Sequence, residues 1–419
     1  RDYQQDQLNL ADAHRQAGSS FKPFTLVAAF RRHIPPGSVF STKSPLYLPQ
    51  WTGNACSCVS NAEGAGDSGY QDLWTATADS INVVFAQLIL EVGPDNVVRA
   101  AHDMGIQSDL PAVPSLTLGT ADVSPIEMAS AYQTLANDGK HCDPFTVSKV
   151  LDDHGVLYRH KTRCAQVVSP DIAHLVTAML QGVIARGTGT AAALSPWPAA
   201  GKTGTTQDYS NAWFVGYTRE VATAVWVGFP GTPASMELYF GQSVFGGTLA
   251  APIWHDYMSR IMVGLPAESF PAPPPPQFGS IPDVVGMKAQ HAQDLLVKAN
   301  FTPKIVTVGS ALPAGTVIVE TPAGGTSAQL GALVTLQVSS GVPSVVKVPD
   351  VVGLSQADAS TALQAAGFVV VVVEQHVSDP QSVGAVLTQD PAAGVKAKQG
   401  TTVTITVGTS GHPSPTPTP

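Results

Sequence analysis

The sequence predicts a mixed α/β (α+β) protein, in which an antiparallel sheet flanked by helices is followed by two small α+β modules. Helical apolar patterns dominate the first 200 residues, strand-like patterns follow Gly201, and a proline-rich run precedes an internal repeat. Apolar residues make up 44% of the 419 residues, enough for a sizeable core. The net charge of −9 argues against a nucleic-acid-binding surface.

The first part of the chain, residues 1–265, is predicted to be one domain. Four segments have helical patterns, and three later segments read as successive antiparallel strands joined by the short turns 207–211 and 218–220. The helices are expected at 24–30, 80–92, 126–137 and 172–186, and the strands at 202–206, 212–217 and 221–227.

The four cysteines point to an oxidising compartment. Cys142 and Cys164 flank a predicted hairpin made of residues 145–150 and 157–160, with its turn at 152–155. Facing positions near the open end of a hairpin can come within disulfide range, so we predict a Cys142–Cys164 bond.

The other two cysteines are only one residue apart. A bond between Cys56 and Cys58 would be strained, and we interpret them as free or locally paired thiols. No histidine lies at metal-ligand spacing to either of them, so we expect no metal site.

Residues 266–280 are predicted to be a linker, because four consecutive prolines at 273–276 favour an extended spacer of roughly 3 Å per residue. After it, the sequence at 281–286 recurs at 348–353. We predict two modules, 281–341 and 347–408, and a disordered Ser/Thr/Pro tail at 409–419. Their helices are expected at 289–300 and 355–366, and their strands at 317–321, 333–338, 385–389 and 402–407.

Three short motifs in the first domain carry the chemistry: Ser19-x-x-Lys22, Ser80-x-Asn82 and Lys202-Thr203-Gly204. Enzymes that acylate a serine and move its proton with amines use this set of residues in this order. The set provides a nucleophile, a base and a strand that binds substrate.

Each motif alone is a weak signal. Ser-x-x-Lys recurs at 344–347, where no helix follows, and Ser80 alone fits the cap of a helix. The first copy has a better context, because Pro23 requires a helix to begin nearby and so puts Ser19 at its N-terminus. The helix dipole and a second cation would then lower the pKa of Lys22 towards that of a base.

Two stretches look like nucleotide-binding loops, and neither has the required context. The phosphate-binding loop that ends in Gly-Lys-Thr needs glycine where Pro196 stands, and the glycines at 187–189 follow a helix rather than a strand. No cofactor is expected.

The three motifs and their surroundings resemble the transpeptidase domain of a class A (bifunctional) penicillin-binding protein. The resemblance covers residues 1–260, and the two repeats resemble PASTA modules, a combination similar to that of actinobacterial enzymes, including those of mycobacteria. The stretches that carry it are 15–24, 78–82, 186–191, 200–206, 212–217 and 246–253.

This resemblance implies the penicillin-binding/serine-transpeptidase fold. The family's domain normally opens with a strand hairpin near Gly-Gly-x-Asp-Tyr, of which only Arg1-Asp2-Tyr3 stands here, so we expect the N-terminal strands to be missing. The glycosyltransferase domain is not part of this sequence, and no glycan polymerisation is expected.

The resemblance also implies the catalytic roles. Ser19 attacks the penultimate D-Ala carbonyl of a stem peptide that ends in D-Ala-D-Ala, and Lys22 takes the hydroxyl proton. Ser80, held by Lys22 and Lys202, relays a proton to the departing nitrogen. Asn82 binds the amide side chain of the substrate and orients Lys22.

The last motif implies the substrate contacts. Backbone N–H groups of Ser19 and Thr205 form an oxyanion hole, and Gly204 permits close approach of the substrate. Thr203, Thr205 and Lys202 hold the terminal carboxylate. A β-lactam mimics the donor peptide and acylates Ser19.

Other functions share these residues. A D,D-carboxypeptidase differs only in using water as acceptor, a serine β-lactamase commonly has Ser-Asp-Asn where Ser80-Ile81-Asn82 stands, and a non-catalytic wall-binding or β-lactam-sensing module would keep the site as a vestige. The implied partners are peptidoglycan and β-lactams. We expect action outside the cytoplasm and, since no apolar run of about 18 residues occurs, any membrane anchor upstream of Arg1.

Overall fold

The computed structural model describes residues 9–51, 56–62, 69–230, 234–236, 244–342 and 345–410. The chain divides into two compact units, Arg1–Gly279 with Gln329–Ala332, and Ser280–Ala328 with Leu333–Pro419. The predictions for Arg1-Asp2-Tyr3 and for the tail after Ser410 fall outside the described residues.

The first unit is built around an antiparallel sheet. In the described residues it has three strands in the order β11 (Ala200–Thr205), β12 (Asn211–Tyr217) and β13 (Ala222–Gly228). The sequence predicted these three strands to within two residues. Side chains of β12 alternate: Trp213, Val215 and Tyr217 join the main core, whereas Phe214 joins a second cluster with Trp254.

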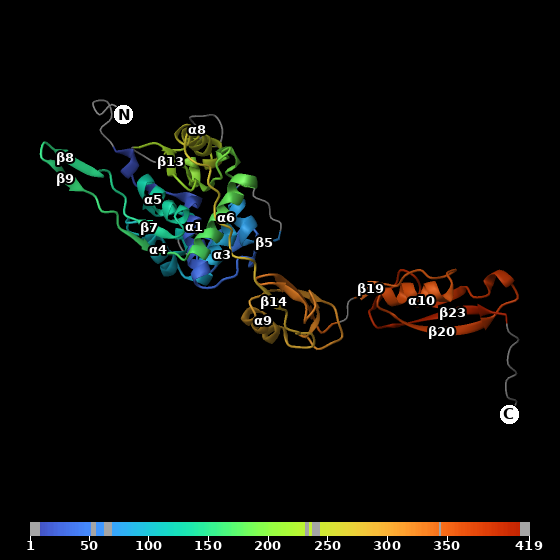
Figure 1. Ribbon diagram of the computed structural model, residues 1–419. Coiled ribbons are helices and arrows are strands. Elements are labelled where there is room, and N and C mark those ends of the chain that lie inside the picture. The colour runs from blue at the N-terminus through green and yellow to red at the C-terminus, as the bar shows by residue number, and fades with distance from the viewer. Residues whose placement is uncertain are drawn as a thin grey trace. The chain divides into compact units, whose positions relative to one another are not determined.

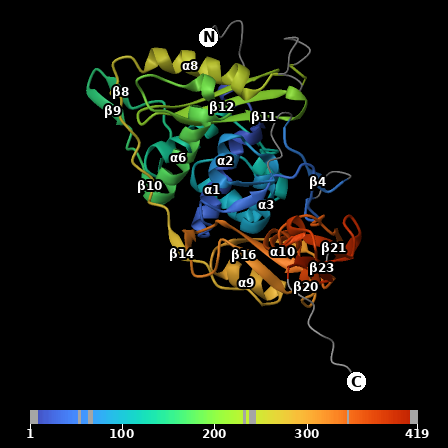
Figure 2. The same cartoon turned by 90° about the vertical axis from the view of Figure 1, so that its right-hand side faces the viewer.

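Helices cover both faces of the sheet (Figure 2). Helix α8 (Ala251–Ile261) supplies Trp254 and Met258 to the cluster on one face, and the main helical group packs on the other. That group contains α1 (Lys22–Arg31), α2 (Leu73–Ala78), α3 (Asn82–Val92), α4 (Pro94–Asp103), α5 (Pro125–Ala136) and α6 (Pro170–Arg186). The four predicted helices correspond to α1, α3, α5 and α6, whereas α2, α4 and α8 were not predicted from the sequence.

Short elements connect these layers. The short helices are η1 (Leu10–Asp12), η2 (Gly18–Phe21), η3 (Pro114–Leu118), η4 (Thr190–Ala192), η5 (Gln207–Tyr209) and the π-helix η6 (Gly246–Ala250). The paired short strands are β1 (Arg15–Gln16) with β6 (Asp122–Val123), β2 (Val39–Ser41) with β5 (Tyr70–Asp72), and β3 (Leu46–Tyr47) with β4 (Cys58–Val59).

The predicted hairpin projects from this unit as β8 (Lys149–Asp152) and β9 (Gly155–Arg159) (Figure 1). At its base, β7 (Lys140–Cys142) pairs with β10 (Cys164–Gln166), so that Cys142 and Cys164 face each other. They form a disulfide with a Cα–Cα distance of 4.1 Å. Cys56 and Cys58 form a second disulfide.

The predicted linker, residues 266–280, contacts the first unit near its beginning. Phe270 packs against the main core, with its ring centroid 5.5 Å from that of Tyr217. The sequence pattern gave no sign that an aromatic residue packs on the core near the beginning of this proline-rich run.

The two repeats share one topology. In the first, β15 (Thr302–Val308) runs parallel to β18 (Leu333–Ser339), and β16 (Val317–Thr321) is antiparallel to it, with α9 (Ala289–Lys298) beside the sheet. The second repeats this arrangement with β20 (Val369–His376), β23 (Thr402–Thr409), β21 (Val386–Asp390) and α10 (Gln356–Ala365). The remaining short elements are β14 (Phe278–Ser280), β17 (Ser327–Gln329), β19 (Val345–Lys347), β22 (Lys396–Lys398) and η7 (Pro380–Ser382).

One buried position differs between the repeats. Glu320 accepts a hydrogen bond from the Val284 N–H through Oε2, at 3.1 Å, but its buried Oε1 has no partner in the described structure. The equivalent Gln389 accepts from the Val351 N–H at 2.8 Å and also donates from Nε2 to the Pro349 carbonyl at 2.9 Å. The Gln389 amide therefore has an N–H group to donate to this carbonyl, whereas the Glu320 side chain makes no such bond.

Candidate active site

The turn that carries Ser19 is held tightly against the end of β11. Ser19 lies in η2, directly before α1, and is half-buried. A Cβ on Gly18, whose φ is +58°, would lie 2.6 Å from the Thr205 carbonyl oxygen, and one on Gly204 would lie 2.3 Å from the Ala17 carbonyl oxygen. Both positions therefore require glycine, and together they bring the Ser19 turn to Thr205.

Lys22 is fully buried at the start of α1. Its Nζ donates to the Ser80 carbonyl oxygen at 2.7 Å and to Asn82 Oδ1 at 2.9 Å, and it lies 3.1 Å from Ser80 Oγ. Burial lowers the pKa of Lys22 well below its usual value, and the nearby charge of Lys202 lowers it further. The sequence pointed to the second cation but gave no sign of burial, which is the larger cause.

Ser80 does not cap a helix. Helix α3 begins at Asn82 with Ile81 at its N-cap, and Ser80 lies outside it with a φ of +59°. This left-handed conformation is uncommon for a residue other than glycine. The alternative interpretation of Ser80 as a helix cap is therefore wrong.

The Ser80 hydroxyl instead links two amines. Lys202 Nζ lies 2.8 Å from Ser80 Oγ, which is also within hydrogen-bond distance of Lys22 Nζ. Lys202 is also fully buried, and burial lowers its pKa from 10.5 to about 7. The three side chains thus form a continuous hydrogen-bonded chain from Lys22 through Ser80 to Lys202.

The hydrogen-bond partners of Lys22 determine which of its N–H groups and lone pairs remain free. A neutral amine has two N–H groups and one lone pair. The Ser80 carbonyl and Asn82 Oδ1 only accept, so they use both N–H groups of a neutral Lys22. Its lone pair is left to accept a proton from a hydroxyl, which is the task of a general base.

The remaining residues of the third motif lie along β11. Thr203 Oγ1 is 3.3 Å from Lys202 Nζ, and Thr205 is half-buried like Ser19. The Thr205 hydroxyl accepts a hydrogen bond from the Gly246 N–H at 3.1 Å, which ties the strand to η6. Ser19, Lys22, Ser80, Asn82, Lys202, Thr203, Gly204 and Thr205 are all in the first unit.

Three supporting residues were not assigned roles from the sequence. The Tyr132 hydroxyl donates to the Ser20 carbonyl at 2.6 Å, and Trp213 Nε1 donates to the Gln16 carbonyl at 2.8 Å, so both hold the chain around Ser19. The hydroxyls of Thr188 and Thr203 are 2.6 Å apart. Thr188 and Trp213 lie in stretches that carried the family resemblance, which was the only available signal.

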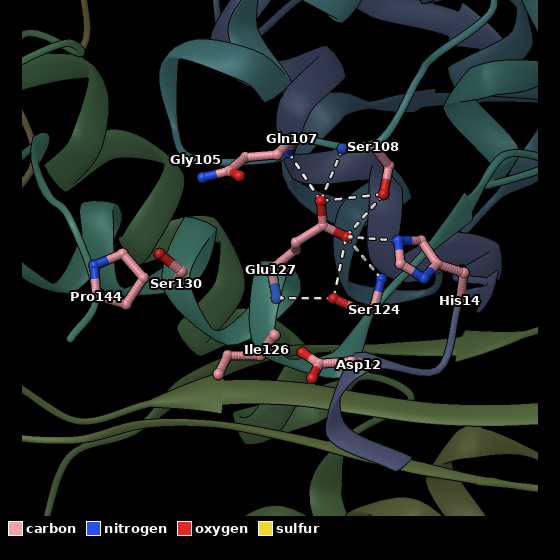
Figure 3. Close-up of a pocket in the computed structure, with 10 residues that line it drawn as sticks. All are labelled: Asp12, His14, Gly105, Gln107, Ser108, Ser124, Ile126, Glu127, Ser130 and Pro144. Carbon is pink, nitrogen blue, oxygen red and sulfur yellow. Dashed lines mark hydrogen bonds and ion pairs between the residues drawn. The ribbon is translucent and has the colours of Figure 1, made fainter. Parts of the chain in front are cut away.

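A pocket of about 410 Å³ lies at the N-terminus of α5 and contains none of these residues (Figure 3). Glu127 is at its centre, where it accepts hydrogen bonds from Gln107, Ser108 and Ser124. Burial raises the pKa of Glu127, but the hydrogen bonds from Ser124, Ser108 and Gln107 outweigh it and lower the pKa. This carboxylate caps α5 and so supports the helix that presents Tyr132.

The described residues contain neither a metal-ligand cluster nor a membrane-spanning helix. No three or more His, Cys, Asp or Glu side chains gather there as a possible metal site. Among the helices that the structure describes, none combines the length and the apolar character needed to cross a membrane.

The comparisons with known proteins agree with this geometry. The family described as penicillin-binding protein transpeptidase domain matches residues 1–258, and the PASTA domain matches residues 279–340 and 346–409. The chain therefore belongs to the penicillin-binding protein transpeptidase family, a family of serine acyltransferases, and carries two PASTA repeats. The predicted fold class and the predicted family are confirmed.

Individual relatives indicate which class of penicillin-binding protein the chain resembles. Over 276 residues the chain is 33% identical to penicillin-binding protein 1A of Aquifex aeolicus, an alignment that covers 65% of this chain and 37% of that protein. The structure of penicillin-binding protein PonA1 from Mycobacterium tuberculosis matches with a TM-score of 0.57 and 31% identity, over 64% of this chain and 74% of that one. These relatives confirm the resemblance to class A enzymes.

The same PonA1 protein in complex with penicillin V matches with a TM-score of 0.56 and 32% identity, over 64% of this chain and 77% of that one. The chain spans about a third of the length of the curated relatives that it matches, with 37% coverage for Aquifex aeolicus and 32% for Neisseria gonorrhoeae.

Proposed function

We propose that this chain is a D,D-transpeptidase that cross-links peptidoglycan stem peptides through an acyl-enzyme on Ser19, and that β-lactams inhibit it covalently. The observation that carries the proposal is the buried Lys22–Ser80–Lys202 chain beside a half-buried serine. Relatives that are named for penicillin binding support it.

Acylation begins at Ser19. Its Oγ forms a bond to the penultimate D-Ala carbonyl carbon while its proton passes to the Lys22 lone pair. Burial and the charge of Lys202 lower the pKa of Lys22 and so favour the neutral amine that carries this lone pair. The backbone N–H groups of Ser19 and Thr205 would hold the oxyanion, a contribution typically worth about 3–4 kcal/mol for each donor.

The leaving group needs a proton when its C–N bond breaks. The Ser80 hydroxyl can supply one to the departing D-Ala nitrogen and take one back from either amine, because both lie within hydrogen-bond distance of its Oγ. Asn82 orients Lys22 and remains half-exposed for the amide of the substrate.

The donor peptide is held along β11. Lys202 and the hydroxyls of Thr203 and Thr205 would bind its terminal carboxylate, and the lack of a side chain at Gly204 lets β11 lie against the Ser19 turn. The acyl-enzyme is then attacked by an amine of a second stem peptide. As the new amide forms and the ester bond to Ser19 breaks, the proton lost by the amine passes through the Lys22–Ser80 chain to the Ser19 oxygen.

The surroundings proposed for this reaction are extracytoplasmic. Two disulfides are compatible with an oxidising compartment, and the PASTA repeats would bind peptidoglycan fragments near the substrate.

The first experiment is intact-protein mass after brief exposure to benzylpenicillin. The parent should gain one stable adduct, Ser19→Ala should gain none, and Ser20→Ala should keep the adduct, because the Ser20 hydroxyl is occupied by the Ala17 carbonyl. No adduct with intact drug would refute an active site, and no adduct with hydrolysed drug would indicate a β-lactamase.

A second experiment separates transfer from hydrolysis. The protein is given a donor peptide ending in D-Ala-D-Ala with and without a D-amino acid as acceptor amine, and the products are resolved by mass. A product that contains the acceptor supports the transpeptidase. Release of D-Ala with only the shortened peptide as co-product would identify a D,D-carboxypeptidase instead.

A further inference from the structure

The sheet of the second repeat ends in an unusually apolar edge strand. Strand β20 begins with five consecutive valines and lies at the margin of the order β20–β23–β21, so in the described residues no strand pairs with its outer edge (Figure 1). Four of these valines are well exposed, at 51%, 43%, 36% and 46% for Val369, Val371, Val372 and Val373. An exposed apolar edge of this kind is a template for pairing with another strand.

The direction of the backbone groups follows from the pairing with β23. The Val369 N–H donates to the Thr401 carbonyl, so Val369 and every second residue after it point their N–H and C=O groups towards β23. Val370, Val372, Glu374 and His376 therefore direct theirs to the outer edge. These groups are available for a regular ladder of hydrogen bonds.

The first repeat shows how the same edge is blocked. Thr302 pairs with Leu333 in β15–β18 as Val369 pairs with Thr402 in β20–β23, so Pro303 corresponds to Val370 and Lys304 to Val371. Proline removes an N–H that would point outwards, and lysine on an edge opposes pairing by its charge. Strand β20 carries neither residue.

We propose that the outer edge of β20 binds the same edge of a second copy of this chain, so that two antiparallel β20 strands join the two sheets. This goes beyond the proposed reaction and does not depend on it. A two-fold axis through Val372 places Val372 opposite its own copy and Val371 opposite Val373. The apolar residues then face one another along the centre of the new ladder.

Charge disfavours registers whose axis is shifted towards Glu374. With Val372 on the axis, each Glu374 faces a Val370, and the two Glu374 residues are four positions apart, or about 13 Å at the usual rise of a strand. That distance exceeds the screening length of about 8–10 Å at ordinary ionic strength. Moving the axis to Val373 would bring the two carboxylates to about half that separation.

The proposed association produces a closed dimer. Both chains use the same edge, so the interface is isologous and leaves no further copy of that edge exposed. The contact is small, and we therefore expect a weak, concentration-dependent dimer rather than a permanent one.

The test is sedimentation velocity of the whole chain over about a hundredfold range of concentration. The parent should move from monomer to dimer. Val371→Lys, which copies Lys304, should weaken the dimer at least about tenfold. The matched control Val352→Lys adds the same charge at an exposed valine of the same repeat that lies outside β20, and should dimerise as the parent does. A monomeric parent, open-ended aggregation, or a dimer unaffected by Val371→Lys would overturn the proposal.

A cross-link tests the register without relying on a disruptive variant. All four native cysteines are in disulfides, so one new cysteine is a clean probe. Residues in a hydrogen-bonded antiparallel pair have Cα atoms about 5.5 Å apart, within disulfide range. Val372→Cys should form a covalent dimer under mild oxidation well before Val352→Cys does, and equal rates for the two variants would refute the register.

Discussion

Replacing Lys202 by methionine should stabilise the first unit while abolishing acylation by penicillin. Methionine has nearly the same length and shape as lysine but carries no charge, so Lys202→Met removes the cost of burying an amine without opening a cavity. Lys202 is 0% exposed, and the main helical group and the sheet enclose it. Residues that serve a reaction often reduce stability in this way.

The size of the effect follows from the pKa of Lys202. Burial lowers it from 10.5 to about 7, and each pKa unit corresponds to about 1.4 kcal/mol, so keeping this amine protonated in the fold costs about 5 kcal/mol. The variant also loses hydrogen bonds to Ser80 Oγ, Thr203 O and Thr203 Oγ1, worth about 0.5–1.5 kcal/mol each. We expect a net gain of about 1–3 kcal/mol at pH 7, or several degrees in Tm at about 2–4 °C per kcal/mol.

The dependence on pH distinguishes this cause from better packing. Between pH 7 and about 10 the unfolded parent binds a proton at Lys202 that the folded parent does not, so the parent gains stability as pH rises. The variant has no such group. Its advantage over the parent should therefore shrink by about 1.4 kcal/mol per pH unit above pH 7 and reverse near pH 9.

Tryptophan fluorescence is a suitable assay. All six tryptophans precede residue 266, so the signal reports unfolding of the first unit and not of the repeats. Lys140→Met, at an exposed lysine, is the matched control and should change Tm little at any of these pH values. An advantage of Lys202→Met that does not change between pH 7 and pH 9, or a loss of stability at pH 7, would refute the reasoning.

Three further predictions use the supporting contacts. Tyr132→Phe leaves the buried Ser20 carbonyl without its donor, and should lower the free energy of unfolding by about 1–3 kcal/mol and slow acylation by penicillin, measured by fluorescence and by mass. Glu320→Gln should stabilise the first repeat by about 1–2 kcal/mol and Gln389→Glu should destabilise the second, both measured by hydrogen exchange of the repeat. Hydrogen bonds from Arg219 and His174 lower the pKa of Asp138, so its contribution to stability is present above pH 4 and is lost on acidification, and Asp138→Asn should flatten acid unfolding of the first unit.

The order of the motifs and the strands of the sheet could be predicted because each rests on local sequence. Alternating apolar residues in β12 and the Gly-rich ends of β11 define strands without knowledge of their neighbours. The hairpin was less well predicted: the first strand begins at Lys149 instead of residue 145. Both of its strands are exposed throughout, so no core contact imposes a pattern that marks their ends.

Tertiary contacts of the site could not be predicted, because the atoms that meet are far apart in sequence. The Tyr132 hydroxyl reaches Ser20 across 112 positions, and a tyrosine inside a helical pattern is otherwise a core residue. The positive φ of Ser80 was also hidden, since serine before an apolar run is more often a cap. Only the complete fold shows that this residue faces two lysines.

The charges of Lys22 and Lys202 explain why the Ser80 hydroxyl lies between the two amines. Two ammonium groups joined through one hydroxyl repel each other in a buried site, and burial and this repulsion together lower the pKa of Lys22. In the proposed reaction, a proton that Lys22 takes from Ser19 is therefore in an unfavourable position and tends to leave. Ser80 offers the exit, because its Oγ contacts both amines and can pass a proton to a departing nitrogen as it accepts one. The burial that destabilises the fold thus favours both steps of the proposed reaction, first by freeing a base and then by driving its proton onward.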